Sequence, residues 1–156
     1  MDRRALYILT VITLIIINGC QKEQPVINRY SKIPPGTAKE TPESDYHPPR
    51  LHSNEYNKPV PLGAVSTTGA EDSPFIPADR KELYFFFTPD VSVPPEKQLL
   101  DEVTGIYVSK YSDGVWQEAE RVILQNPGKL ALDGCEFVQN DTMLFCTARE
   151  GYTGLH

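Results

Sequence analysis

The chain has 156 residues, which leaves room for one domain of ordinary size. Its formal net charge is -6, from 15 basic and 21 acidic residues. This balance argues against a nucleic-acid partner, because phosphate neutralisation needs clustered lysine and arginine. Proline is frequent, at 14 residues, and hydrophobic residues make up 40%. We therefore expect part of the chain to lie outside any packed core.

Residues 1–19 have the pattern of an export signal. A short basic start with Arg3 and Arg4 precedes an apolar run over residues 5–17, and the small residue Gly19 stands directly before Cys20. The apolar run is shorter than the ~20 residues that a membrane-spanning helix needs. This order of regions therefore predicts a secretory signal peptide.

The end of the signal, Ile17-Asn18-Gly19-Cys20, resembles the lipobox of bacterial lipoproteins, with Asn18 as a less usual filler. The resemblance implies that the Cys20 thiol is acylated and that Cys20 becomes the new amino terminus. Two or three acyl chains would hold the chain firmly on a membrane. We therefore predict a cell-envelope protein, lipid-anchored on the periplasmic side of an outer membrane or at the cell surface. The alternative is an ordinary signal with an incidental cysteine.

Residues 20–70 are expected to form a lipidated, flexible tether. The stretch contains eight prolines and few aliphatic residues. Such a composition cannot bury enough apolar surface to offset chain entropy, and proline keeps it extended. His47 and His52 are spaced too loosely for a compact ligand set. We therefore predict no metal site and no cofactor.

The part expected to fold, residues 71–156, is predicted to be all-β. Residues 83–88 are aromatic and bounded by turn residues, and residues 105–110 alternate in polarity. The Asp113-Gly114 pair predicts a hairpin into an outer strand that runs from residue 115 towards residue 124. The insertion at residues 89–104 is the stretch in which we expect specificity to lie. Within it, residues 96–103 are expected to make two helical turns, with Pro95 at the first position.

A strand-turn-strand unit at residues 71–86 returns in degraded form at residues 133–146. Phe75 matches Phe137, and Tyr84 matches Leu144, with a turn two residues shorter in the second copy. Self-similarity at a spacing of about 60 residues predicts a repeat architecture.

The motifs of the first copy resemble the TolB-type propeller repeat, also called the WD-like repeat, of exported bacterial proteins. The matching motifs are Pro74-Phe75-Ile76, Leu83-Tyr84-Phe85, Ile106-Tyr107-Val108-Ser109, Asp113-Gly114 and Trp116, and the departures from the pattern are Ala78, Arg80 and Ala119. The resemblance implies antiparallel β-propeller blades, one full and one partial. A propeller closes with about four to eight blades, so we expect an incomplete propeller and a truncated chain. A small, complete two-sheet β domain is the alternative.

Cys135 and Cys146 form a candidate disulfide. A two-residue turn at Asn140-Asp141 would place the two cysteines directly opposite each other on paired strands. Opposed side chains come close enough for a disulfide, and an exported chain meets oxidising conditions. Two buried free thiols remain the alternative interpretation.

Five carboxylates lie at or near strand starts, at Glu71, Asp72, Asp133, Glu136 and Glu150. In propeller glycosidases, acids at such positions line a central funnel and do acid–base work. The simpler interpretation is that they fix turns, and the sequence has no Ser-His-Asp arrangement or Gly-rich phosphate loop. We therefore predict a non-catalytic, membrane-anchored protein that binds a protein or glycan partner. A fragment of a glycan-active hydrolase is the alternative.

Metabolic labelling tests the lipid anchor. We predict that the chain takes up a palmitate analogue in bacterial cells and that Cys20→Ala abolishes the label, because the thiol is the acylated atom. A wild-type chain without label, or equal label on the variant, would end the lipoprotein interpretation.

Overall fold

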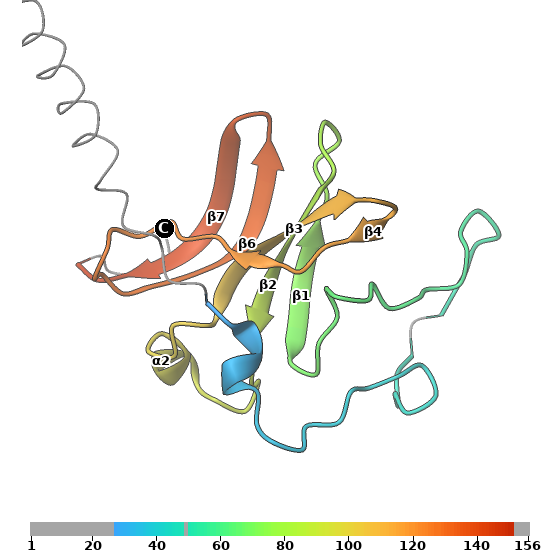
Figure 1. Ribbon diagram of the computed structural model, residues 1–156, viewed down its shortest axis with the longest axis horizontal. Helices are drawn as coiled ribbons and strands as arrows, with labels where there is room; N and C mark the ends of the chain where they lie inside the picture. Colours follow the sequence, from blue (N-terminus) through green and yellow to red (C-terminus); the bar gives the residue numbers. More distant parts are fainter. Residues whose placement is uncertain (1–26, 49, 152–156) are drawn as a thin grey trace, which may run out of the picture.

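A computed structural model describes residues 27–48 and 50–151, and its strands are all antiparallel (Figure 1). The signal segment and Cys20 lie outside the described residues. Within the described ranges, none of the helices has the length and apolar character needed to cross a membrane. The prediction of an all-β fold is confirmed at this level.

The first sheet is an antiparallel meander of β1 (Ala70–Phe75), β2 (Glu82–Thr88) and β3 (Gly105–Ser112). Beyond it, the outer strand is split into β4 (Val115–Trp116) and β5 (Glu120–Arg121), which both pair with β3. Between the two pieces, the hydroxyl of the buried Ser109 donates to the carbonyl of Gln117, at 2.6 Å. The outer strand expected from residue 115 is therefore two short pieces.

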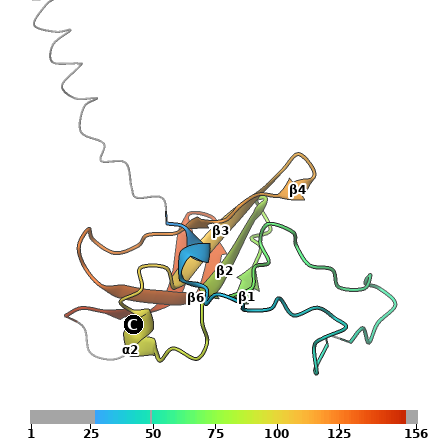
Figure 2. The same ribbon diagram turned by 60° about the horizontal axis from the view of Figure 1, so that its bottom comes forward.

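The second sheet is a hairpin of β6 (Ala131–Gln139) and β7 (Thr142–Arg149), which packs across the first sheet (Figures 1 and 2). Gly134 allows the close approach, since an added Cβ there would lie 2.9 Å from the ring of Phe86. Nearby, the rings of Phe75 and Phe137 have centroids 4.9 Å apart. These two phenylalanines are the equivalent positions of the predicted repeat.

The β1–β2 hairpin contains a bulge. Asp72 pairs with Phe86, and the next pair along is Phe75 with Tyr84, so two residues oppose one. Ser73, inside the bulge, has a φ of 51°. A β-bulge of this kind bends the strand and increases its twist.

The β6–β7 hairpin contains the same bulge, 62 positions further on. Gly134 pairs with Cys146 and the next pair is Phe137 with Leu144, while Cys135 has a φ of 54°. The two copies thus share a backbone irregularity as well as a sequence pattern. The expected register is confirmed from the turn to Phe137, but the facing of Cys135 and Cys146 is wrong, because the bulge shifts Gly134 opposite Cys146.

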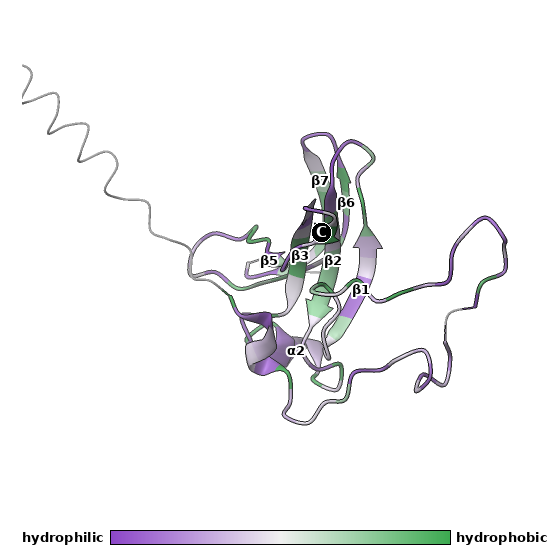
Figure 3. Cartoon of the chain, turned by 45° about the vertical axis from the view of Figure 1, so that its right-hand side comes forward, coloured by the Kyte–Doolittle hydropathy of each residue, from purple (hydrophilic) through white to green (hydrophobic). Residues whose placement is uncertain are grey.

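The hydrophobic core lies on one face of the first sheet. Leu83, Phe85 and Phe87 alternate along β2 and are buried there with Val103 and Tyr107. The ring centroids of Phe87 and Tyr107 are 5.5 Å apart in an edge-on contact. Figure 3 shows the hydrophobic residues concentrated along β2 and β3.

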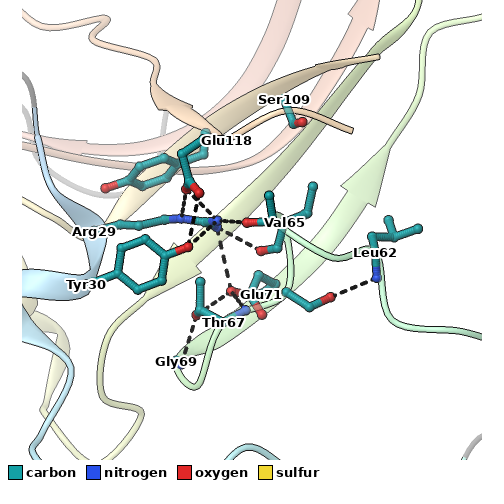
Figure 4. A network of polar contacts seen from close by, with 12 residues as sticks. Arg29, Tyr30, Leu62, Val65, Thr67, Gly69, Glu71, Ser109 and Glu118 are labelled. Carbon is teal, nitrogen blue, oxygen red and sulfur yellow. Dashed lines mark hydrogen bonds and ion pairs between the residues drawn. The ribbon is translucent and has the colours of Figure 1, made fainter. Parts of the chain in front are cut away.

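A short 3₁₀ helix, η1 (Arg29–Lys32), closes this core from the amino-terminal side. Only 2% of Arg29 is exposed, and its Nε donates to Glu118 at 2.9 Å while Nη1 donates to the carbonyl of Val65 at 2.8 Å (Figure 4). Glu71 lies 3.8 Å from Nη1. Parts of the expected tether, around η1 and Val65, therefore belong to the folded unit.

The insertion forms only one helical turn, α2 (Pro95–Gln98). Proline stands at the first helical position, as predicted, but the helix ends sooner than expected. Beyond the helix, the Asp101 carboxylate accepts hydrogen bonds from the backbone N–H groups of Val103 and Thr104, both at 2.7 Å. These bonds hold the chain in a turn that leads into β3.

Arg29→Ala should lower the free energy of unfolding by about 3 kcal/mol, because it leaves buried carbonyls and Glu71 without their cationic partner. Urea denaturation measures the loss. Arg50→Ala is the matched control, since Arg50 is exposed in the loop that follows η1, and we expect less than about 0.5 kcal/mol there. Equal effects of the two variants would contradict the role given to Arg29.

Candidate functional site: a cleft beside the insertion

A cleft of about 730 Å³ opens where η1, the insertion and the connection from β5 to β6 meet. We call it the insertion cleft. Its apolar lining comes from all three segments, namely Ile27, Leu99, Val103, Ile123, Leu130 and Ala131. A cleft of this volume, lined by these apolar side chains together with many polar and charged ones, suits a small molecule or a short chain segment.

The wall made by the insertion is held rigidly. Asp101 fixes the backbone of Val103 and Thr104, and the Thr104 hydroxyl also donates to Asp101 at 2.6 Å. The hydroxyl of Tyr107 donates to the carbonyl of Val103 at 2.8 Å from within the core. Asp101 is therefore occupied by its own loop, although it lines the cleft.

Arg121 is the central cation of the cleft. Its guanidinium occupies the space that a Cβ at Gly105 would fill, with Nη2 nearest, and its Cζ lies 5.9 Å from the centre of the Tyr107 ring. Gly105 has a φ of 146°, so glycine suits this position both for its conformation and for the room it leaves. Packing against β3 thus fixes the place of the charge.

Two buried polar atoms on the lining have no partner among the described residues. Arg121 donates from Nη1 to the carbonyl of Glu102 at 3.2 Å, but its Nε has no acceptor. Gln125 has a buried Oε1 without a donor. A buried unpaired group costs about 1–3 kcal/mol, and both of these atoms belong to residues that line the cleft.

Two of the strand-start carboxylates are engaged in similar ways. Glu71 accepts from the Thr67 hydroxyl at 2.6 Å and lies beside Arg29. The buried Asp133 accepts from the Thr147 hydroxyl and lies 3.4 Å from Nη2 of Arg149. Each carboxylate therefore ties segments of the fold together.

Two more of these carboxylates lie at the surface. Asp72 is exposed and accepts from the backbone N–H of Ser73 at 2.7 Å. Glu150 is exposed and pairs with Lys129 at 3.2 Å. The five positions singled out from the sequence do not gather at the insertion cleft, whose lining contains none of them.

Glu136 is the unusual member of the five. Only 5% of it is exposed, and both of its carboxylate oxygens are buried without a hydrogen-bond partner among the described residues. Burial raises the pKa of Glu136 to about 7, and the negative charge of Asp72 adds to the shift. The carboxyl therefore holds its proton to a higher pH than an exposed glutamate does, and it lies away from solvent.

Cys135 and Cys146 are free thiols in this structure, and both are exposed. Burial raises the pKa of the Cys135 thiol, and the neighbouring Cys146 thiol adds to the shift. The bulge accounts for the exposure of Cys135, because it turns this residue out of the regular alternation. The pair lies close together, so the disulfide stays a prediction, whereas the expectation of buried thiols is wrong.

Comparisons with protein-family models, with curated proteins and with solved structures give no match to this chain. The sequence had pointed to the insertion but not to Arg121, which lies in a stretch interpreted as an outer strand. One signal was present, namely an arginine directly before the apolar run Val122-Ile123-Leu124.

The pH dependence of stability tests the burial of Glu136. Since its folded pKa of about 7 lies above the ordinary value of 4.5, the native state holds the extra proton between these values. Stability should therefore fall as pH rises from about 4.5 to about 7. Glu136→Gln should remove this fall and gain up to about 3 kcal/mol at pH 8, with little change at pH 4.

Urea unfolding at pH 4, 6 and 8 measures this difference. The exposed Glu40 provides the control, and Glu40→Gln should leave the curve of the wild type in place. A Glu136→Gln variant that follows the wild-type curve at every pH would show that the carboxyl is not held in a buried, unpaired state.

Proposed function

We propose that this chain is a non-catalytic, lipid-anchored binding protein, exposed outside the cytoplasm, that captures a protein or glycan partner in the insertion cleft. The observation that carries the proposal is the place of Arg121, a cation without a carboxylate partner among the described residues, on one cleft lined by three segments. Binding sites combine an apolar concave lining with a few polar groups that fix orientation.

Binding is favoured over hydrolysis by the state of the carboxylates. A hydrolase acting through strand-start acids needs two carboxyl groups facing one substrate. Glu71 and Asp133 are instead each held by an arginine and a threonine. Glu136 has a raised pKa, as a general acid would, but its oxygens are sealed from solvent.

The proposal includes the TolB-type propeller architecture for residues 71–156. It is supported by the meander of β1, β2, β3 and β5, which has the strand order of a four-stranded blade. It is also supported by the second hairpin, which repeats the bulge of the first and packs against it through Phe75 and Phe137. The export signal and Cys20 support the envelope location.

The two adjacent leucines of the insertion give a matched test. Leu99 lines the cleft, whereas Leu100 does not and is 62% exposed. We expect Leu99→Ser to weaken capture of the partner about tenfold, the equivalent of about 1.4 kcal/mol, and Leu100→Ser to leave it unchanged. Point variants are preferable to removal of residues 89–104, because Val103 belongs to the core.

The measurement is a pull-down from detergent-solubilised envelopes of the source cells, with both variants checked for wild-type stability. A species captured equally by both variants would place the binding surface elsewhere. If Leu100→Ser alone lost capture, the binding surface would likewise lie outside the insertion cleft.

A further inference from the structure

We propose that the insertion cleft recognises the carboxyl terminus of a peptide chain that ends in an apolar residue, with Arg121 receiving the carboxylate. The inference rests on the proposed function, because it names the ligand of the same cleft. It selects a protein partner over a glycan and specifies the part of that partner which enters.

The charge of the cleft is the first argument. The chain as a whole is acidic, at -6, yet the lining has three basic residues, Lys32, Arg121 and Lys129, against the acidic Asp101 and Glu102. Asp101 is occupied by the insertion backbone and by the hydroxyl of Thr104. Lys129 is paired with Glu150, so the cations that an anionic group can meet are Lys32 and Arg121, which have no carboxylate partner among the described residues.

The fixed position of Arg121 is the second argument. Its guanidinium is packed against Gly105 and Tyr107 and donates one N–H to the carbonyl of Glu102. Arg29 and Arg149 each have a carboxylate partner within the fold, whereas Arg121 has none among the described residues. A planar guanidinium with free donors fits a carboxylate, and a side chain held by packing loses little entropy when it binds one.

The other residues that line the cleft indicate which kind of carboxylate-bearing ligand fits it. Apolar side chains such as Leu99, Ile123 and Leu130 face a ligand with an apolar group, and the lining includes no aromatic ring on which a sugar face could stack. Gln125, whose Oε1 has no donor among the described residues, belongs to the same lining. A carboxylate, an N–H donor and an apolar side chain occur together at the end of a peptide chain, while a fatty acid lacks the donor.

The test compares two peptides on the wild-type chain by fluorescence anisotropy. The probe is a fluorescein-labelled pentapeptide ending in leucine, either with a free carboxylate or with a terminal amide. We expect the free acid to bind about tenfold more tightly or better. Equal binding of the two peptides, or no binding of either at about 1 mM, would overturn the inference.

Variants of the protein test whether Arg121 is the residue that causes the preference for the free-acid peptide. Arg121→Gln should abolish the difference between acid and amide, whereas Arg80→Gln should keep it, since Arg80 does not line the cleft and pairs with Asp79. Because Arg121 packs against Gly105, the folding of Arg121→Gln is checked by circular dichroism, and the peptide comparison on the wild type stands without it. A preference that a folded Arg121→Gln variant retains would overturn the assignment.

A digalacturonate probe separates this inference from the proposed function. Binding of the acidic disaccharide in place of the free-acid peptide, with the same dependence on Arg121, would overturn the peptide inference and leave a glycan-binding protein. Envelope capture that does not respond to Leu99→Ser would instead contradict the proposed function itself.

Discussion

The structure depends on one buried cation. Arg29 lies almost wholly out of water, where an unpaired charge would be strongly unfavourable. Its partners come from distant parts of the chain, the carbonyl of Val65 and the carboxylates of Glu71 and Glu118. Its Cζ also lies 5.7 Å from the ring of Phe85. By satisfying this one charge, the fold draws η1 onto the core and so completes a wall of the insertion cleft.

Three arginines contribute to the interior in different ways. Arg29 and Arg149 balance their charges within the fold, through Glu118 and Asp133. Arg121 packs against Gly105 and the Tyr107 ring and donates to a backbone carbonyl, but it has no carboxylate partner among the described residues. Because the fold holds the guanidinium of Arg121 in place without a carboxylate partner in the described ranges, this group can still bind an anionic ligand. This contrast separates the cleft from the ion pairs that stabilise the sheets.

Much of the fold was predictable because its signals are local. The Asp113-Gly114 turn, the first helical proline and the two hairpins follow from neighbouring residues. The bulge at Cys135 was not predictable, because the residues with positive φ in the two bulges are Ser73 and Cys135, and neither is a glycine that would mark such a position. The cleft was missed for a related reason, since it joins residues 27–32, 98–104 and 121–131, and no local pattern records their meeting.

The docking of η1 also limits how far the folded part of the chain can lie from a membrane to which Cys20 is anchored. If Cys20 is lipidated as proposed, nine residues separate the anchor from Arg29, a length of chain that spans at most about 30 Å. Without this docking, the segment between the anchor and the folded part would extend to β1. Because Ile27 and Lys32 line the insertion cleft, the cleft would be confined to a thin layer above the bilayer. Chain ends displayed in that layer would be met at a raised effective concentration, and those further away would be out of range.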